Sequence, residues 1–207
     1  MGVQLLWDVD TQVDFCLPDG RLYVSGSETV LPAMRRLVEW ARAEGLVHVA
    51  SADDHEYGDP EISDEPDFTD TYPPHCLRGT RGADKVPETR QDDPVPLGEL
   101  VYPPGQVRRL IAGRREILLL KKNFDVFTNP NAEKVLDALQ PERIVLFGVA
   151  TDVCNDAAIR GLRRRGYPVT FVEDAARGLD DARVARCTAD WRGLDVEFTT
   201  VAAVTGA

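Results

Sequence analysis

Short runs of apolar residues alternate with amphipathic stretches along most of this chain. The run Val3–Val9 is apolar at most positions and predicts a buried strand. The amphipathic stretch Glu28–Glu44 carries its apolar residues on one stripe at helical spacing, and it predicts a helix that ends at Gly45. By the same criteria, further strands are expected at Val47–Ala52, Glu116–Lys121, Arg143–Val149, Pro168–Glu173 and Val196–Val201, and further helices at Asn131–Leu139, Val153–Arg165 and Asp180–Arg192.

Strands that are apolar on both faces and alternate with helices are typical of a mostly parallel sheet covered on each side by helices. We therefore predict a doubly wound, three-layer α/β fold with a central six-stranded sheet. The 207 residues fit one domain, 1–207, which an irregular insert at 53–113 interrupts. The second part of this insert, 87–113, contains several prolines and predicts a stiff loop that covers a cleft or contacts a partner.

Charge and composition exclude several classes of protein. The chain has 24 basic and 35 acidic residues, and its net charge of −11 repels nucleic acids and anionic lipids. No apolar run approaches the roughly 20 residues of a membrane-spanning helix, and the first residues lack the basic start of a secretion signal. The four cysteines are far apart in the sequence and predict free thiols. We expect a cytoplasmic protein without nucleic-acid or membrane partners, and the sequence leaves open whether it forms a homo-oligomer.

Polar residues follow the predicted strands. In open parallel sheets, ligands bind beyond the carboxyl ends of the strands, so these residues are candidates for chemistry. They are Asp8, Asp10, Asp53, His55, Lys121, Lys122 and the segment Gly148–Cys154.

Cys154 lies in the predicted first turn of a helix, directly after a buried strand. The free N–H groups and the dipole of such a turn favour a thiolate and can bind an oxyanion. The alternative is a small core residue, because Cys154 shares a helix face with Ala158 and Leu162.

A cysteine nucleophile needs a proton acceptor, and histidine is the usual choice. His48 falls inside a predicted strand, however, and His55 and His75 lie in the acidic insert. Asp10 is then the candidate base, supported by Lys121 from a strand that we expect to neighbour the first. The alternative for these two residues is an ordinary ion pair.

The insert carries a second candidate site. Asp53 and His55 are two residues apart at a strand end, so both side chains can point to one side, and two prolines precede His75. Two imidazoles and a carboxylate suit Zn²⁺, with Fe²⁺ and Mn²⁺ as alternatives. From Asp53 to Asp70 there are nine acidic residues and no Lys or Arg, a pattern that equally fits a solvated loop.

Taken together, these motifs resemble the cysteine hydrolase superfamily of nicotinamidases and isochorismatases over almost the whole chain. Asp10–Phe15 resembles its DxQxDF opening, Lys121 with Phe127 resembles its lysine motif, and Gly148–Cys154 resembles its GVATDxC segment. The segments that resemble the metal-binding branch, the nicotinamidases and pyrazinamidases, are Asp53–His55, Tyr72–Cys76 and Gly79–Ala83.

The resemblance implies a catalytic triad of Asp10, Lys121 and Cys154. It also implies an oxyanion hole formed by the backbone N–H groups of Ala150 and Cys154, with a cis peptide bond between Val149 and Ala150.

The resemblance further implies a divalent metal ion, with zinc expected, bound by Asp53, His55 and His75. Glu61 stands where the family often has a histidine and is the expected additional ligand. Phe15 and Tyr72 are expected to flank the substrate.

The implied reaction is hydrolysis of nicotinamide, or of a similar aromatic amide such as pyrazinamide, to the acid and ammonia through a cysteine thioester. One alternative within the superfamily is hydrolysis of another small amide or carbamoyl compound. An alternative of a different class is a non-catalytic binding protein that retains the fold.

Overall fold

The computed structural model describes residues 4–206 and contains a seven-stranded sheet in which every pairing is parallel. The order across the sheet is β3-β4-β2-β1-β5-β6-β7. The first half of the chain adds strands on one side of β1, and the second half adds them on the other side. The strands are β1 (Gln4–Val9), β2 (Val47–Asp53), β3 (Val95–Leu97), β4 (Glu116–Lys121), β5 (Arg143–Val149), β6 (Val169–Arg177) and β7 (Glu197–Thr199).

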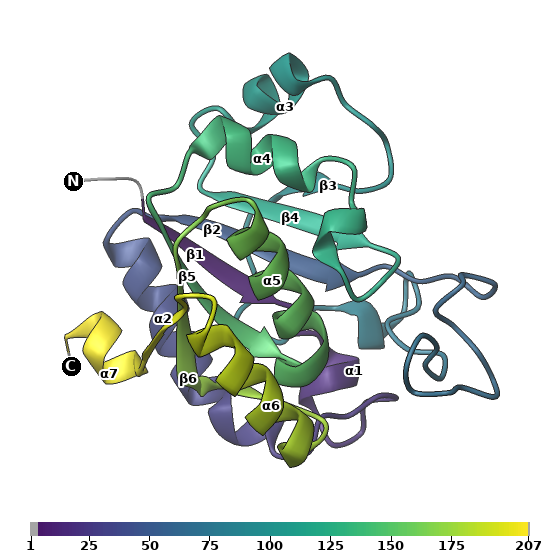
Figure 1. Cartoon of the computed structure of the whole chain (residues 1–207). Coiled ribbons are helices and arrows are strands. Elements are labelled where there is room, and N and C mark those ends of the chain that lie inside the picture. Colours follow the sequence, from purple (N-terminus) through teal and green to yellow (C-terminus); the bar gives the residue numbers. More distant parts are fainter. Residues whose placement is uncertain (1–3, 207) are drawn as a thin grey trace.

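Helices cover both faces of the sheet (Figure 1). One apolar layer packs against α3, α4, α5 and α6, and the other packs against α2 and α7. The helices are α1 (Val13–Cys16), α2 (Leu31–Ala43), α3 (Pro104–Ile111), α4 (Ala132–Leu139), α5 (Asp156–Arg164), α6 (Asp181–Arg192) and α7 (Val201–Thr205), joined by short helical turns η1 (Ser27–Val30), η2 (Arg81–Ala83), η3 (Val126–Thr128) and η4 (Thr151–Asn155). No helix within residues 4–206 is long and apolar enough to cross a membrane.

The predicted doubly wound α/β fold is confirmed, with one strand more than expected. The additional strand, β3, lies in the proline-rich stretch 87–113, which also contains α3. This stretch is therefore not the stiff loop that its prolines predicted. Pro96 is tolerated within β3 because β3 is an edge strand, where one side of the backbone needs no partner.

Other elements differ from prediction mainly at their ends. The helix expected at Glu28–Glu44 begins with the turn η1, and α2 starts at Leu31 with Pro32 in its first turn, where a missing N–H costs nothing. The last strand is shorter than expected because the chain turns into α7. Val3, the predicted start of the first strand, lies outside the described residues.

Alternation along β1 divides its side chains between the two apolar layers. Leu5, Trp7 and Val9 face the layer under α4 and α5, whereas Leu6 faces the layer under α2. At the end of this strand a side chain on Gly148 would bring its Cβ within 2.1 Å of the Val9 carbonyl oxygen. Glycine therefore allows β1 and β5 to stay paired up to the point where the candidate residues begin.

Candidate active site and metal centre

Four strands that are consecutive across the sheet carry the candidate residues at their carboxyl ends. Lys121 ends β4, Asp53 ends β2, Asp10 follows β1, and the π-helical turn η4 with Cys154 follows β5. Residues separated by more than a hundred positions in the chain are thus brought into one row. Irregular chain after β2, which holds His55, Glu61 and His75, extends beyond the same edge of the sheet (Figure 1).

Lys121 connects the two candidate sites. Its Nζ lies 2.9 Å from Oδ2 of Asp10 and also donates to Oδ1 of Asp53, and all three side chains are buried. The sequence argument expected the strands of Lys121 and Asp10 to be neighbours, but β2 lies between them, and Lys121 is in register with Asp53. Burial alone would lower the pKa of Lys121, but the two carboxylates raise it by more than burial lowers it. The ammonium form is therefore stabilised.

Asp10 is held on two sides. Its Oδ1 accepts a 2.7 Å hydrogen bond from Ser51 Oγ, while Lys121 faces Oδ2. Burial raises the pKa of this carboxyl group, and the opposing effect of Lys121 does not fully cancel the increase. A buried carboxylate with a raised pKa is a stronger proton acceptor than a solvated one.

Cys154 lies in η4, before α5 rather than in its first turn. It is 7% exposed, and that small exposed area lines a cavity. Burial raises the pKa of the thiol well above its usual value, and Lys121 lowers it only in part. The thiolate expected from the helix-terminus argument is therefore not favoured here, and the thiol needs a base. Ala150 lines the same cavity, and its peptide bond with Val149 is cis, as predicted.

The second group of side chains is suited to a metal ion. Donor atoms of Asp53, His55, Glu61 and His75 all lie within 4.8 Å of one another, and all four residues are buried. Asp53 Oδ2 and both ring nitrogens of His55 have no hydrogen-bond partner among the described residues. Buried polar atoms are normally satisfied, so this arrangement of nitrogen and oxygen atoms fits a divalent cation such as Zn²⁺.

Neighbouring groups orient these donor atoms. His75 Nδ1 lies 2.8 Å from the carbonyl oxygen of Pro73, which leaves Nε2 directed at Asp53, 3.5 Å from its Oδ2. On the other histidine, Nδ1 lies 3.4 Å from Oδ2 of Asp59, which also pairs with Lys122. A carbonyl in the position of Pro73 fixes the imidazole tautomer at metal sites, whereas His55 makes no hydrogen bond to Asp59.

Two residues that support the site were not predicted from the sequence. Gln12 Nε2 donates to the carbonyl oxygen of Asp53 at 2.8 Å, and its Oε1 accepts from the N–H of Asp53 at 2.7 Å. Asp14 Oδ2 accepts a 2.7 Å hydrogen bond from the N–H of Cys76, next to His75. Both residues belong to the DxQxDF motif, so the motif itself contained the signal.

The cavity beside Cys154 is small and largely apolar, with an empty volume of about 300 Å³ that includes open solvent. The ring centroids of Phe15 and Tyr72 lie 5.3 and 6.2 Å from that of His75, and both aromatic residues line the cavity. The stretch 87–113 contributes no lining residue to this cavity and does not cover it. The cavity is lined by Phe15, Leu22, Val24, Asp53, Glu61, Tyr72, His75, Ala150, Val153, Cys154 and Leu179.

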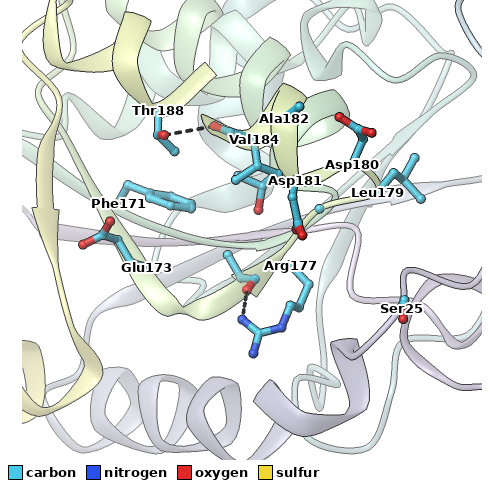
Figure 2. A pocket seen from close by; sticks show the side chains of 13 residues that line it. Ser25, Phe171, Glu173, Arg177, Leu179, Asp180, Asp181, Ala182, Val184 and Thr188 are labelled. Atoms are coloured by element: carbon cyan, nitrogen blue, oxygen red, sulfur yellow. Dashed lines mark hydrogen bonds between the residues drawn. The ribbon is translucent and has the colours of Figure 1, made fainter. Parts of the chain in front are cut away.

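A larger, more polar groove adjoins this cavity (Figure 2). Its empty volume, which includes open solvent, is about 1490 Å³. Leu179 lines both spaces, and Val24 and Ala150 in the cavity are followed in the chain by Ser25 and Thr151 in the groove. Leu179 is fixed by the buried Asp152, whose Oδ1 accepts its backbone N–H at 2.8 Å. Leu179 therefore lies where the cavity and the groove meet.

Sequence comparison matches residues 5–99 and 104–203 to the isochorismatase domain family. The chain belongs to this family. A curated relative, the nicotinamidase/pyrazinamidase of Mycobacterium tuberculosis, is 26% identical over 194 residues, which cover 92% of this chain and 95% of that protein. The relative confirms the resemblance to the nicotinamidase and pyrazinamidase branch.

Solved structures share the fold. The zinc complex of Pyrococcus horikoshii pyrazinamidase superposes with a TM-score of 0.75 at 20% identity, covering 95% of this chain and 98% of that one. The N-carbamoylsarcosine amidase of Thermoplasma acidophilum superposes with a TM-score of 0.73 at 22% identity, covering 96% of each chain.

Proposed function

We propose that this protein is a cysteine-dependent amidohydrolase that converts nicotinamide, or a similar aromatic amide such as pyrazinamide, to the acid and ammonia. One observation carries the proposal. A buried cysteine lines a small apolar cavity together with Asp53, Glu61 and His75 of the candidate metal group, and Lys121 pairs with both Asp53 and the buried Asp10. The family match and the curated relative support the same reaction class.

In the first half-reaction Asp10 accepts the thiol proton, and Cys154 Sγ attacks the amide carbon. Lys121 keeps the Asp10 carboxylate in place and stabilises the thiolate as it forms. The backbone N–H groups of Ala150 and Cys154 bind the oxyanion of the tetrahedral intermediate. Collapse of the intermediate breaks the C–N bond, and Asp10 returns the proton to the departing ammonia.

In the second half-reaction Asp10 accepts a proton from water, which attacks the thioester carbon, and the acid leaves as Cys154 regains its proton. Asp53, His55, Glu61 and His75 would hold the divalent metal, zinc in our proposal. When bound, the ion supplies a positive coordination point that orients a ring nitrogen directly or through water. Phe15 and Tyr72 flank the ring.

The lining of the cavity favours an uncharged ring over a ureido acid. Phe15, Leu22, Val24, Tyr72 and Leu179 form apolar walls, and the residues found to line the cavity include no Arg or Lys. A substrate carboxylate would lose its hydration there, and no Arg or Lys among these lining residues would pair with it. N-carbamoylsarcosine, the substrate named for one structural neighbour, is therefore the informative competitor.

The proposal is tested by measuring ammonia release from nicotinamide, pyrazinamide, benzamide and N-carbamoylsarcosine on one preparation of known metal content. We expect the two ring-nitrogen amides to be hydrolysed fastest, because benzamide has no nitrogen to coordinate. Preference for N-carbamoylsarcosine would move the function to carbamoyl compounds. Binding without release from any of these amides would support a non-catalytic protein.

Lys121 and Lys122 provide a matched pair of substitutions. Lys121→Met should reduce kcat by about a hundredfold or more, because it removes the buried charge that faces the base. Lys122→Met should retain most of the activity, because that side chain pairs with Asp59 outside the cavity. Steady-state turnover and melting temperature of both variants test the assignment. A large loss confined to the Lys122 variant would show that the wrong lysine is assigned.

Leu179 should limit the size of the substrate. Leu179→Ala opens the cavity toward the groove, so kcat/KM for nicotinamide carrying a phenyl substituent should rise about tenfold relative to nicotinamide itself, in line with the binding energy of a few methylene groups. Val184→Ala is the control, because Val184 lines the groove only. An unchanged ratio in the Leu179 variant would mean that this wall does not set specificity.

A further inference from the structure

A second buried ion pair, Asp8 with Lys85, lies close in the chain and in space to the proposed base, Asp10. Asp8 on β1 is completely buried, and its Oδ2 lies 2.9 Å from Nζ of Lys85, whose side chain is 8% exposed. Asp8 Oδ1 accepts a 2.8 Å hydrogen bond from Thr11 Oγ1. The proposed mechanism uses none of these groups.

Stability alone does not account for this pair. Asp8 shares its face of β1 with Leu6, in the apolar layer under α2. Apolar residues of similar volume commonly replace a buried ion pair with no loss of stability, because desolvation of the charges offsets their attraction. The charges at this position therefore point to a role in orienting other groups.

The pair contacts both chain segments that define the position of Asp10. Thr11, bound to Asp8, directly follows Asp10. Lys85 Nζ donates to the carbonyl oxygen of Ser51 at 3.3 Å, the same oxygen that accepts the backbone N–H of Asp10 at 3.2 Å. Ser51 Oγ in turn donates to Asp10 Oδ1.

The backbone of Asp10 needs such support. Its φ of 49° lies in the left-handed region, which residues other than glycine seldom occupy unless their surroundings hold them there. We propose that the Asp8–Lys85 pair is a positioning device for Asp10, which fixes Ser51 and Thr11 and through them the carboxylate that receives the thiol proton. The inference rests on the proposed function in this one respect, that Asp10 acts as the base.

Segment 85–91 completes the network from outside the catalytic motifs. Thr89 Oγ1 lies 2.5 Å from Thr11 Oγ1, and Gln91 Nε2 donates to the carbonyl oxygen of His48 at 2.9 Å. The His48 ring lies 3.6 Å from Asp8, too far for a hydrogen bond, so it fills space beside the pair. Segment 85–91 therefore supports the position of Asp10 although it does not line the cavity.

The main test is the double variant Asp8→Leu/Lys85→Met, which removes both charges together. We expect kcat for nicotinamide to fall about tenfold with KM changed less than twofold, while the melting temperature stays within a few degrees of wild type. Leu6→Ala is the control, because it weakens the same layer without touching the network, and its kcat should be unchanged. Equal kcat in the double variant and the wild type would overturn the proposal.

Two further measurements keep the proposal testable if the double variant folds poorly or if the substrate is not among the amides tested. Thr11→Val, nearly isosteric and uncharged, should lower kcat about threefold. The rate at which iodoacetamide alkylates Cys154 should fall in parallel, and this rate needs no amide substrate. If the wild type hydrolyses no amide, the proposed function fails, and the alkylation rates still decide whether the pair positions Asp10. Alkylation rates unchanged in both variants would reject the inference.

Combining Ser51→Ala with the double variant tests whether the ion pair acts on Asp10 through Ser51. Because Ser51 transmits part of the effect, the combined loss in kcat should be smaller than the product of the separate losses. Losses that multiply would show that the ion pair and Ser51 act independently, which would contradict the proposal.

Discussion

Replacing Cys154 by alanine should lower amide hydrolysis by about 10⁴-fold or more while leaving the fold intact. Loss of a nucleophile removes the covalent pathway entirely, and comparable substitutions in other hydrolases have effects of this size. The side chain is small and borders a cavity, so its removal should lower the free energy of unfolding by only about 1 kcal/mol. Ammonia release and thermal unfolding measure the two effects.

Cys187→Ala is the matched control, because Cys187 lies on α6 and lines neither the cavity nor the groove. It should retain the activity of the wild type. Residual turnover near the wild-type rate in the Cys154 variant would reject the thioester mechanism.

Alkylation of the native protein should label Cys154 before the other cysteines. Burial raises the pKa of Cys16 to about 12 and that of Cys76 well above its usual value, and both side chains are fully buried. Burial also raises the pKa of Cys154, and Cys187 is more exposed than Cys154, so the expected order depends on the cavity and on Asp10 as the proposed base. Peptide mapping after brief exposure to iodoacetamide checks the order, and equal labelling would contradict an activated thiol.

Removal of the metal should abolish turnover of nicotinamide and leave Cys154 open to alkylation. The four proposed ligands lie next to the proposed catalytic pair, Asp10 and Lys121, but are separate residues. Loss of the ion should therefore affect substrate binding more than the reactivity of Cys154. Without the ion, the insert after β2 should become more sensitive to proteolysis. Metal content, turnover and limited proteolysis are measured before and after chelation, and after separate additions of Zn²⁺, Mn²⁺ and Fe²⁺.

His75→Ala and Asp64→Asn provide a comparison within the insert. His75 is buried among the proposed ligands, whereas Asp64 is exposed. Only the histidine variant should lose metal and activity. Full activity in metal-free protein would instead favour the solvated-loop interpretation of this acidic segment.

The sequence was sufficient for the parts of the fold with long apolar runs. The bounds predicted for the strands Glu116–Lys121 and Arg143–Val149 are those observed, because each contains a continuous apolar run, buried at alternate positions in the first strand and after Arg143 throughout the second. β3 was missed because three residues around a proline give no periodic signal. The sheet order was also incompletely predicted, because pairing between distant strands depends on contacts that no local pattern contains.

Candidate site residues were found where motifs gave both type and spacing. Asp53, His55, Glu61 and His75 were named from the sequence, and the structure brings their donor atoms together. The walls formed by Leu22, Val24 and Leu179 could not be predicted, because they come from irregular segments whose direction depends on tertiary contacts. The hydrogen bond from Leu179 to Asp152 is one such contact.

The shared position of Lys121 constrains how this chain could evolve away from metal binding. Single substitutions could remove either histidine of the cluster, but Asp53 also balances the charge of Lys121 together with Asp10. A neutral residue in place of Asp53 would leave the lysine with one counter-charge and draw it toward Asp10. We therefore expect a lineage that loses the ion to retain this aspartate long after its histidines have changed.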